Sequence, residues 1–62
     1  MKIMPFAGTL VRFTRTLDDE TLQLIDGDER VGVVTSRNRA MSTMRVCTSP
    51  GVYYTVALAD AN

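Results

Sequence analysis

The chain has 62 residues and a formal net charge of zero, with seven basic and seven acidic side chains, one cysteine, no histidine and no tryptophan. This length fits one domain, which buries only about 60% of the surface of its unfolded chain and therefore has a thin stability margin. One cysteine excludes an internal disulfide, and the balanced charge argues against a dedicated nucleic-acid binder. Association with other protein chains is the remaining way to stabilise so small a domain.

The first residues are predicted to form an extended arm. Ile3, Met4 and Phe6 are apolar, but Pro5 disfavours both a helix and a central strand. These side chains either cap the open end of the domain's own core or dock on a partner. The run is too short for a signal peptide or a membrane span. The predicted organisation is an N-terminal arm at 1–8, one small β-domain at 9–58 and a frayed C-terminus at 59–62.

Short segments of alternating apolar and polar residues recur along the rest of the chain. Strands are expected at residues 9–16, 21–25, 30–36, 43–48 and 52–58. Their near-regular spacing predicts an all-β fold, a small antiparallel five-stranded barrel or sandwich that closes on itself to avoid exposed edges. The period of two predicts a core of Val11, Phe13, Leu22, Leu24, Val31, Val33, Met44, Val46, Tyr54, Val56 and Leu58.

Glycines mark three special positions. Asp26-Gly27 separates two apolar runs and predicts a tight hairpin turn with positive φ at the glycine. Ser49-Pro50-Gly51 predicts a type II turn. Gly32 interrupts the strand at residues 30–36, which indicates a bulge, a bend or a close approach by another backbone.

Residues 17–25 have two interpretations. In the preferred one, an acidic turn is followed by a strand that begins at Thr21 and forms a hairpin with the strand before it. In the other, Thr16 with Asp19 or Glu20 caps one or two turns of helix.

The charges are divided along the chain. Six of the seven acids fall within residues 18–29, and Arg30, Arg37, Arg39 and Arg45 follow them. One interpretation is a set of Asp-built turns and a solvated basic loop. The other is a pair of complementary patches that join neighbouring subunits.

Catalytic and metal-binding signals are weak. Without histidine, acid-base catalysis would need a carboxylate with a raised pKa in a dry pocket, which a barrel this small can hardly hold, so we expect no enzyme and no cofactor. Cys47 is interpreted as a packed strand residue. Asp26, Asp28 and Glu29 lack the ligand spacing of a calcium loop and are assigned to turns. Of the two adjacent tyrosines, which could stack on single-stranded nucleic acid, one is expected in the core and one at an interface.

Three pieces occur in an order that resembles a known family. They are Gly8-Thr9-Leu10-Val11, then Glu29-Arg30-Val31-Gly32-Val33-Val34-Thr35, then residues 44–53 with Ser49-Pro50-Gly51-Val52-Tyr53 at their end. This order is similar to the opening strand, the glycine-containing central strand and the closing hairpin of the small β-rich capsid cement, or decoration, proteins of tailed bacteriophages. The match runs from about Gly8 to Leu58. Arg37 and Arg39 depart from it, because the family's loop there is often acidic or contains glycine.

The resemblance implies a non-enzymatic structural protein on the capsid surface of a virion, made in the host cytoplasm. Its partner would be the major capsid protein, and it would also self-associate, with a trimer as one arrangement, and bind neither nucleic acid nor a membrane. The alternative is a small β-barrel binding module, such as a phage-encoded inhibitor or a nucleic-acid binder. The physics of the residues gives the candidate protein-interface positions, which are Ile3, Met4, Phe6, Arg37, Arg39, Arg45 and Tyr53.

Overall fold

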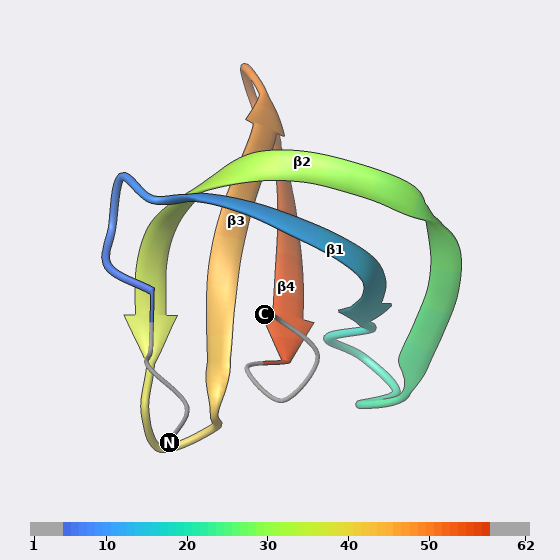
Figure 1. Cartoon of the computed structure of the whole chain (residues 1–62). Coiled ribbons are helices and arrows are strands. Elements are labelled where there is room, and N and C mark those ends of the chain that lie inside the picture. The colour runs from blue at the N-terminus through green and yellow to red at the C-terminus, as the bar shows by residue number, and fades with distance from the viewer. Residues whose placement is uncertain (1–4, 58–62) are drawn as a thin grey trace.

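The computed structural model describes residues 5–57, which form one four-stranded antiparallel sheet and no helix (Figure 1). The strands are β1 (Leu10–Leu17), β2 (Leu24–Asn38), β3 (Thr43–Ser49) and β4 (Val52–Ala57), and each pairs with the next along the chain. The prediction of an all-β, antiparallel fold is confirmed. The prediction of five strands is wrong, because the sheet has four. The prediction of a closed barrel is also wrong, because this sheet is open.

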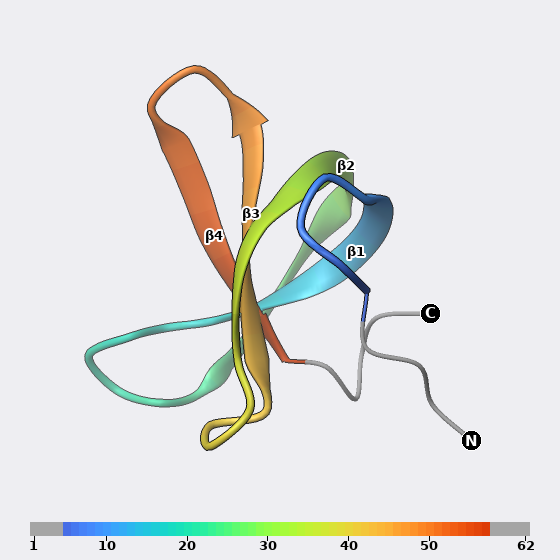
Figure 2. The ribbon, with the colours of Figure 1, turned by 90° about the vertical axis from the view of Figure 1, so that its left-hand side faces the viewer.

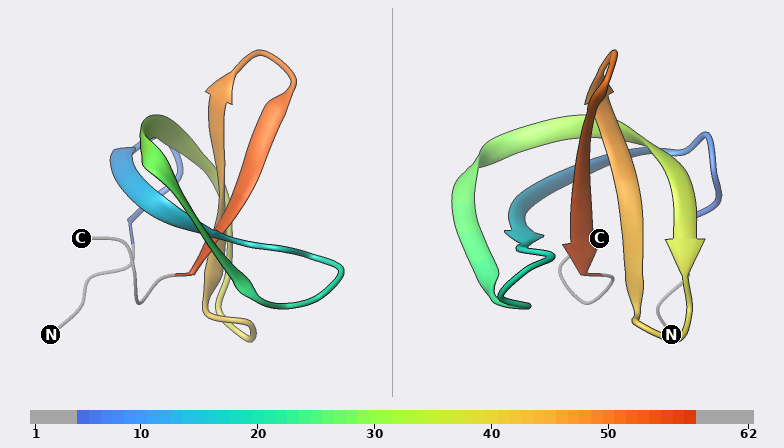
Figure 3. Two further views of the ribbon diagram at one scale, coloured as in Figure 1. Left: turned by 90° about the vertical axis from the view of Figure 1, so that its right-hand side faces the viewer. Right: turned by 180° about the vertical axis from the view of Figure 1, so that it is seen from behind.

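The sheet is strongly curved because β2 is 15 residues long and arches over the other strands (Figure 1). Its first part pairs with β1 and its last part pairs with β3. Seen from the side, the β1–β2 ribbon crosses the β3–β4 ribbon (Figures 2 and 3). This curvature brings the two end strands together, so that the Phe13 and Tyr54 rings lie 5.7 Å apart between centroids.

The turn predicted at Asp26-Gly27 is wrong. Asp26 pairs with Arg15 of β1, and Gly27 lies inside β2 without a positive φ. Strand pairing on β1 therefore overrides the local turn preference of Asp-Gly, and the two strands predicted on either side of it are one continuous strand.

The connection between β1 and β2 is a turn and not a helix. The Asp18 amide donates to the Gln23 carbonyl at 2.9 Å, and the Leu22 amide donates to the Asp18 carbonyl at 2.7 Å. The preferred hairpin interpretation of this segment is confirmed, although the second strand starts at Leu24 instead of Thr21. The predicted turn at Pro50-Gly51 is also confirmed, with φ of 78° at Gly51.

The core is smaller than predicted. Its buried hydrophobic members are Val11, Phe13, Val34, Met44, Val46 and Val56, with Tyr54 packed against them. Four predicted core residues, Leu22, Leu24, Val31 and Val33, are exposed instead. Leu58, also predicted there, lies outside the described residues.

On β2 the prediction chose the wrong face. Gly32 pairs with Val11 and Val34 with Val46, so these two β2 residues face the core, whereas Val31 and Val33 face outward. A Cβ atom at Gly32 would lie 2.5 Å from Val46 Cγ1 and 2.8 Å from the Cys47 carbonyl oxygen. Gly32 is therefore the site of a close backbone approach, one of the three roles predicted for it.

Candidate protein interface

More hydrophobic side chains are exposed than buried. Among residues 5–57, ten large hydrophobic residues are exposed, whereas six form the buried core. Single exposed hydrophobic residues are normal on a soluble protein, but a contiguous group indicates a contact site. The strand register shows which of them are neighbours.

One group forms a row across all four strands. Leu10 of β1 lies opposite Val33 of β2, Val33 lies opposite Cys47 of β3, and Cys47 lies opposite Tyr53 of β4. Directly opposite residues share a face of the sheet, so these four side chains, here called the outer row, lie side by side on the face away from the core. Leu10 is 66% exposed and Tyr53 is 52% exposed. The outer row is thus a largely apolar strip across this face of the sheet.

Val31 and the ion pair of Arg12 with Glu29 lie beside the outer row. Val31 lies two residues from Val33 on β2 and so points to the same face. Opposite Val31, the exposed Arg12 side chain places its Nη1 atom 3.9 Å from Glu29 Oε1. Cys47, which is half-buried, donates its thiol to the Ser49 carbonyl at 3.1 Å.

The two adjacent tyrosines divide as predicted with respect to the core. Tyr54 packs against the core, and its hydroxyl accepts a hydrogen bond from Arg30 Nη1 at 2.9 Å. Tyr53 points to the other face and is exposed in the outer row. It is the one predicted interface residue within this row.

A pocket of about 640 Å³ lies between the β1–β2 turn and the end of β2 with the β2–β3 turn. Leu17, Asp19 and Leu22 form one wall, and Arg37, Arg39, Met41 and Arg45 lie on the other side. We call it the arginine pocket. Three of the predicted interface residues, the arginines, are thus brought to one place by the fold.

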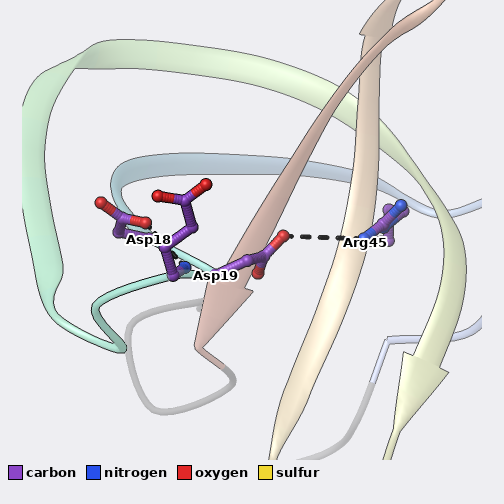
Figure 4. Close-up of polar contacts among 4 residues, drawn as sticks. Asp18, Asp19 and Arg45 are labelled. Atoms are coloured by element: carbon purple, nitrogen blue, oxygen red, sulfur yellow. Dashed lines mark hydrogen bonds and ion pairs between the residues drawn. The ribbon is translucent and has the colours of Figure 1, made fainter.

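The three arginines of the pocket differ in their contacts. Arg45 Nη2 lies 3.8 Å from Asp19 Oδ2, which joins the β1–β2 turn to β3 (Figure 4). The Arg37 guanidinium lies over the Phe6 ring, 5.0 Å from its centroid, a cation–π contact. Within residues 5–57, no carboxylate lies at ion-pair distance from Arg39.

The predicted arm is described only in part. Phe6 is 67% exposed and contacts Arg37, so these two predicted interface residues meet, and Phe6 is not part of the buried core. The Gly8 amide donates to the Val34 carbonyl at 2.8 Å, which fixes the chain just before β1 on β2. Ile3 and Met4 lie outside the described residues.

Several acids that were assigned to turns lie on β2 instead. Asp26 pairs with Arg15, with 3.0 Å between Oδ1 and Nε, and Glu29 pairs with Arg12. Part of the complementarity between acids and arginines is therefore satisfied inside the chain. In the part of the chain that the structure describes, no group of three or more histidine, cysteine, aspartate or glutamate side chains could hold a metal ion.

Asp18 shapes the turn that forms one wall of the pocket. Its Oδ1 atom accepts hydrogen bonds from the Glu20 amide at 2.9 Å and the Thr21 amide at 3.4 Å. These backbone hydrogen bonds lower the pKa of the Asp18 carboxyl, because they favour its ionised form. The ionised carboxylate thereby holds the acidic turn in place beside Arg45.

Sequence reasoning missed the apolar part of both surfaces. Leu10 was not singled out, Val33 and Leu22 were placed in the core, and Met41 lies in a turn where no periodicity applies. The adjacent Val34 was the signal that Val33 could be exposed. Where successive residues are all apolar, the alternation of side chains does not show which face of the strand is buried.

Comparisons of the chain with protein-family models, curated proteins and solved structures found no match. Over residues 5–57 the fold also contains no helix long and apolar enough to span a membrane.

Proposed function

We propose that this chain is a structural interaction protein that works by binding other protein subunits through the face that carries the outer row. The observation behind this proposal is the row itself, in which the exposed side chains of Leu10 and Val33 lie on neighbouring strands of one face and the exposed Tyr53 lies on the other side of the half-buried Cys47. A domain with six buried hydrophobic residues gains from covering this strip.

The sequence resemblance makes a tailed-phage capsid the first partner to test. A cement role suits a small sheet with an apolar face, because such a protein has only to fit where capsid subunits meet. The proposed arrangement places the outer row on the major capsid protein, on the outside of the virion. It involves no catalytic step and no cofactor.

Heads of a phage or prophage whose genome encodes the chain provide the direct test. Purified protein is mixed with these heads and sedimented, and the copies bound per head are counted. Val33→Lys places a charge in the middle of the outer row without touching the core, so we expect at least about tenfold weaker binding. Ala40→Lys adds the same charge at an exposed position in the β2–β3 turn and serves as the matched control.

Failure of the wild-type protein to sediment with heads would contradict the capsid proposal, and equal binding by Val33→Lys would contradict the role of the outer row. The rival function, nucleic-acid binding, is tested with a single-stranded oligonucleotide at rising salt. A nucleic-acid binder would retain the oligonucleotide at low salt and lose it steeply as salt rises.

A further inference from the structure

The arginine pocket has walls of opposite charge. The β1–β2 turn contributes Asp19 to one wall and carries Glu20 beside it, whereas Arg37, Arg39 and Arg45 lie on the other. Asp19 and Arg45 face each other within the chain. Among the described residues, however, no ion pair joins Glu20 or Arg39 to another side chain. Glu20, in the turn beside Asp19, and Arg39, in the pocket lining, are thus an acid and a base without an ion pair among the described side chains.

Exposed apolar side chains accompany these charges. Leu22, from the acidic wall, is 61% exposed, and Met41, from the basic wall, is 55% exposed. Leu22 also has a φ of 58°, a left-handed conformation that a leucine rarely adopts. The turn therefore presents a large apolar side chain to solvent in a strained backbone conformation, although the same side chain makes no contribution to the buried core.

A surface with opposite charges side by side is complementary to its own copy turned by 180°. The acidic part of each copy then faces the basic part of the other, so every contact occurs twice. The chain's zero net charge puts no overall repulsion in the way of such pairing.

We infer that two copies of this chain associate through the arginine pocket about a two-fold axis, with Glu20 of each copy against Arg39 of the other. Leu22 and Met41 of both copies fill the space between the two pockets. This contact uses residues outside the outer row, and it is tested without any capsid, so its failure and the failure of the proposed function are separate results.

Charge exchange provides the test. Sedimentation velocity of the full chain, from micromolar concentrations to about 500 µM, measures the dissociation constant of the dimer. Arg39→Glu or Glu20→Arg alone places like charges together twice per dimer, so each should weaken the dimer at least about tenfold. The double variant restores opposite charges and should return the dissociation constant to within about threefold of wild type.

Two further variants separate the contact from general effects. Asp28→Arg reverses an exposed acid on β2 that does not line the pocket, and it should leave the dimer unchanged. Leu22→Asn removes the apolar side chain, and asparagine tolerates the positive φ of this position. It should weaken the dimer about tenfold while the melting temperature of the dilute protein does not fall.

The inference is overturned if the wild-type chain is monomeric throughout the concentration range, or if it forms a trimer. It is equally overturned if the single reversals dimerise as wild type does, or if the double variant does not recover. Circular dichroism of each variant establishes that it is folded, and the Leu22→Asn comparison decides the question should either charge variant unfold.

Discussion

Every residue of β2 from Leu24 to Val31 is exposed, whereas Gly32 and Val34 farther along the same strand are buried against β1 and β3. The first part, residues 24–31, is held by its ladder with β1 and by the Arg15–Asp26 and Arg12–Glu29 ion pairs. Exposed ion pairs contribute only about 0 to 1 kcal/mol each. Burial on β2 is therefore confined to Gly32 and Val34, and the first part depends on backbone pairing and on exposed polar contacts, which include the hydrogen bond from Arg30 to Tyr54.

This difference separates two uses of hydrophobic residues in one small chain. On β2, Val34 belongs to the core, while Leu24 and Ile25 at the other end of the strand are exposed and available for contact. The first part of β2 should open at lower free energy than the packed part, because few buried contacts hold it. The predictions below test that contrast, from the largest expected effect to the smallest.

The largest contrast is between a core residue and an exposed apolar residue. Met44 is 1% exposed, so Met44→Ala should lower the free energy of unfolding by about 3 kcal/mol through loss of packing and a cavity. Leu24→Ala should lower it by less than about 0.5 kcal/mol, because its side chain already contacts water. Urea denaturation of dilute protein measures both. Equal losses of unfolding free energy in the two variants would contradict the division into buried and exposed hydrophobic residues.

A second contrast compares two glycines on β2. Gly32→Ala should destabilise the fold by about 2 kcal/mol, because the new Cβ atom meets the buried Val46 side chain and the Cys47 backbone. At Gly27 the nearest atom to a new Cβ is the Thr14 carbonyl oxygen at 4.0 Å, an ordinary contact, and φ is not positive. Gly27→Ala should therefore be neutral or stabilise by up to about 1 kcal/mol. A large loss of stability in Gly27→Ala would instead favour the turn with positive φ that the sequence predicts at Gly27.

The smallest effect concerns the acidic turn. Because the pKa of Asp18 is lowered from 3.8 in the folded chain, its stabilisation is complete above that value and is lost as the pH falls through the folded pKa. Asp18→Asn should lower the melting temperature at neutral pH, and the difference from wild type should shrink as the pH falls below 3.8 and through the lowered pKa. Asp28→Asn is the control for removal of one exposed carboxylate outside this turn. If the two proteins differed in melting temperature by the same amount at all pH values, the charge of Asp18 would not contribute to stability.

The alternation of apolar and polar residues predicted burial correctly where only every second residue of a strand is apolar. Val11 and Phe13 on β1, and Met44 and Val46 on β3, alternate with polar residues, and their burial was predicted correctly. Pro50-Gly51 likewise specifies its turn by backbone preference alone. In these places local preference and strand pairing agree.

The failures occur where long-range pairing decides. Residues 31–34 are apolar at both phases except for Gly32, so only the close approach of Val46 shows which face is buried. Asp26-Gly27 has the residues of a turn, but its pairing with β1 keeps it extended. For the arginine pocket, the sequence indicated the arginines as a group, whereas the opposite wall comes from a turn that lies far away in the chain.

Amide hydrogen exchange at two protein concentrations tests the central claim most directly, namely that the exposed hydrophobic residues serve contacts between chains. In dilute protein, amides of the first part of β2, residues 24–31, should exchange faster than those of β3. At high concentration, the amides of the β1–β2 turn, residues 18–23, should become protected, and Arg39→Glu should remove that gain. Equal exchange in β3 and the first part of β2, together with exchange of residues 18–23 that does not change with concentration, would contradict the account.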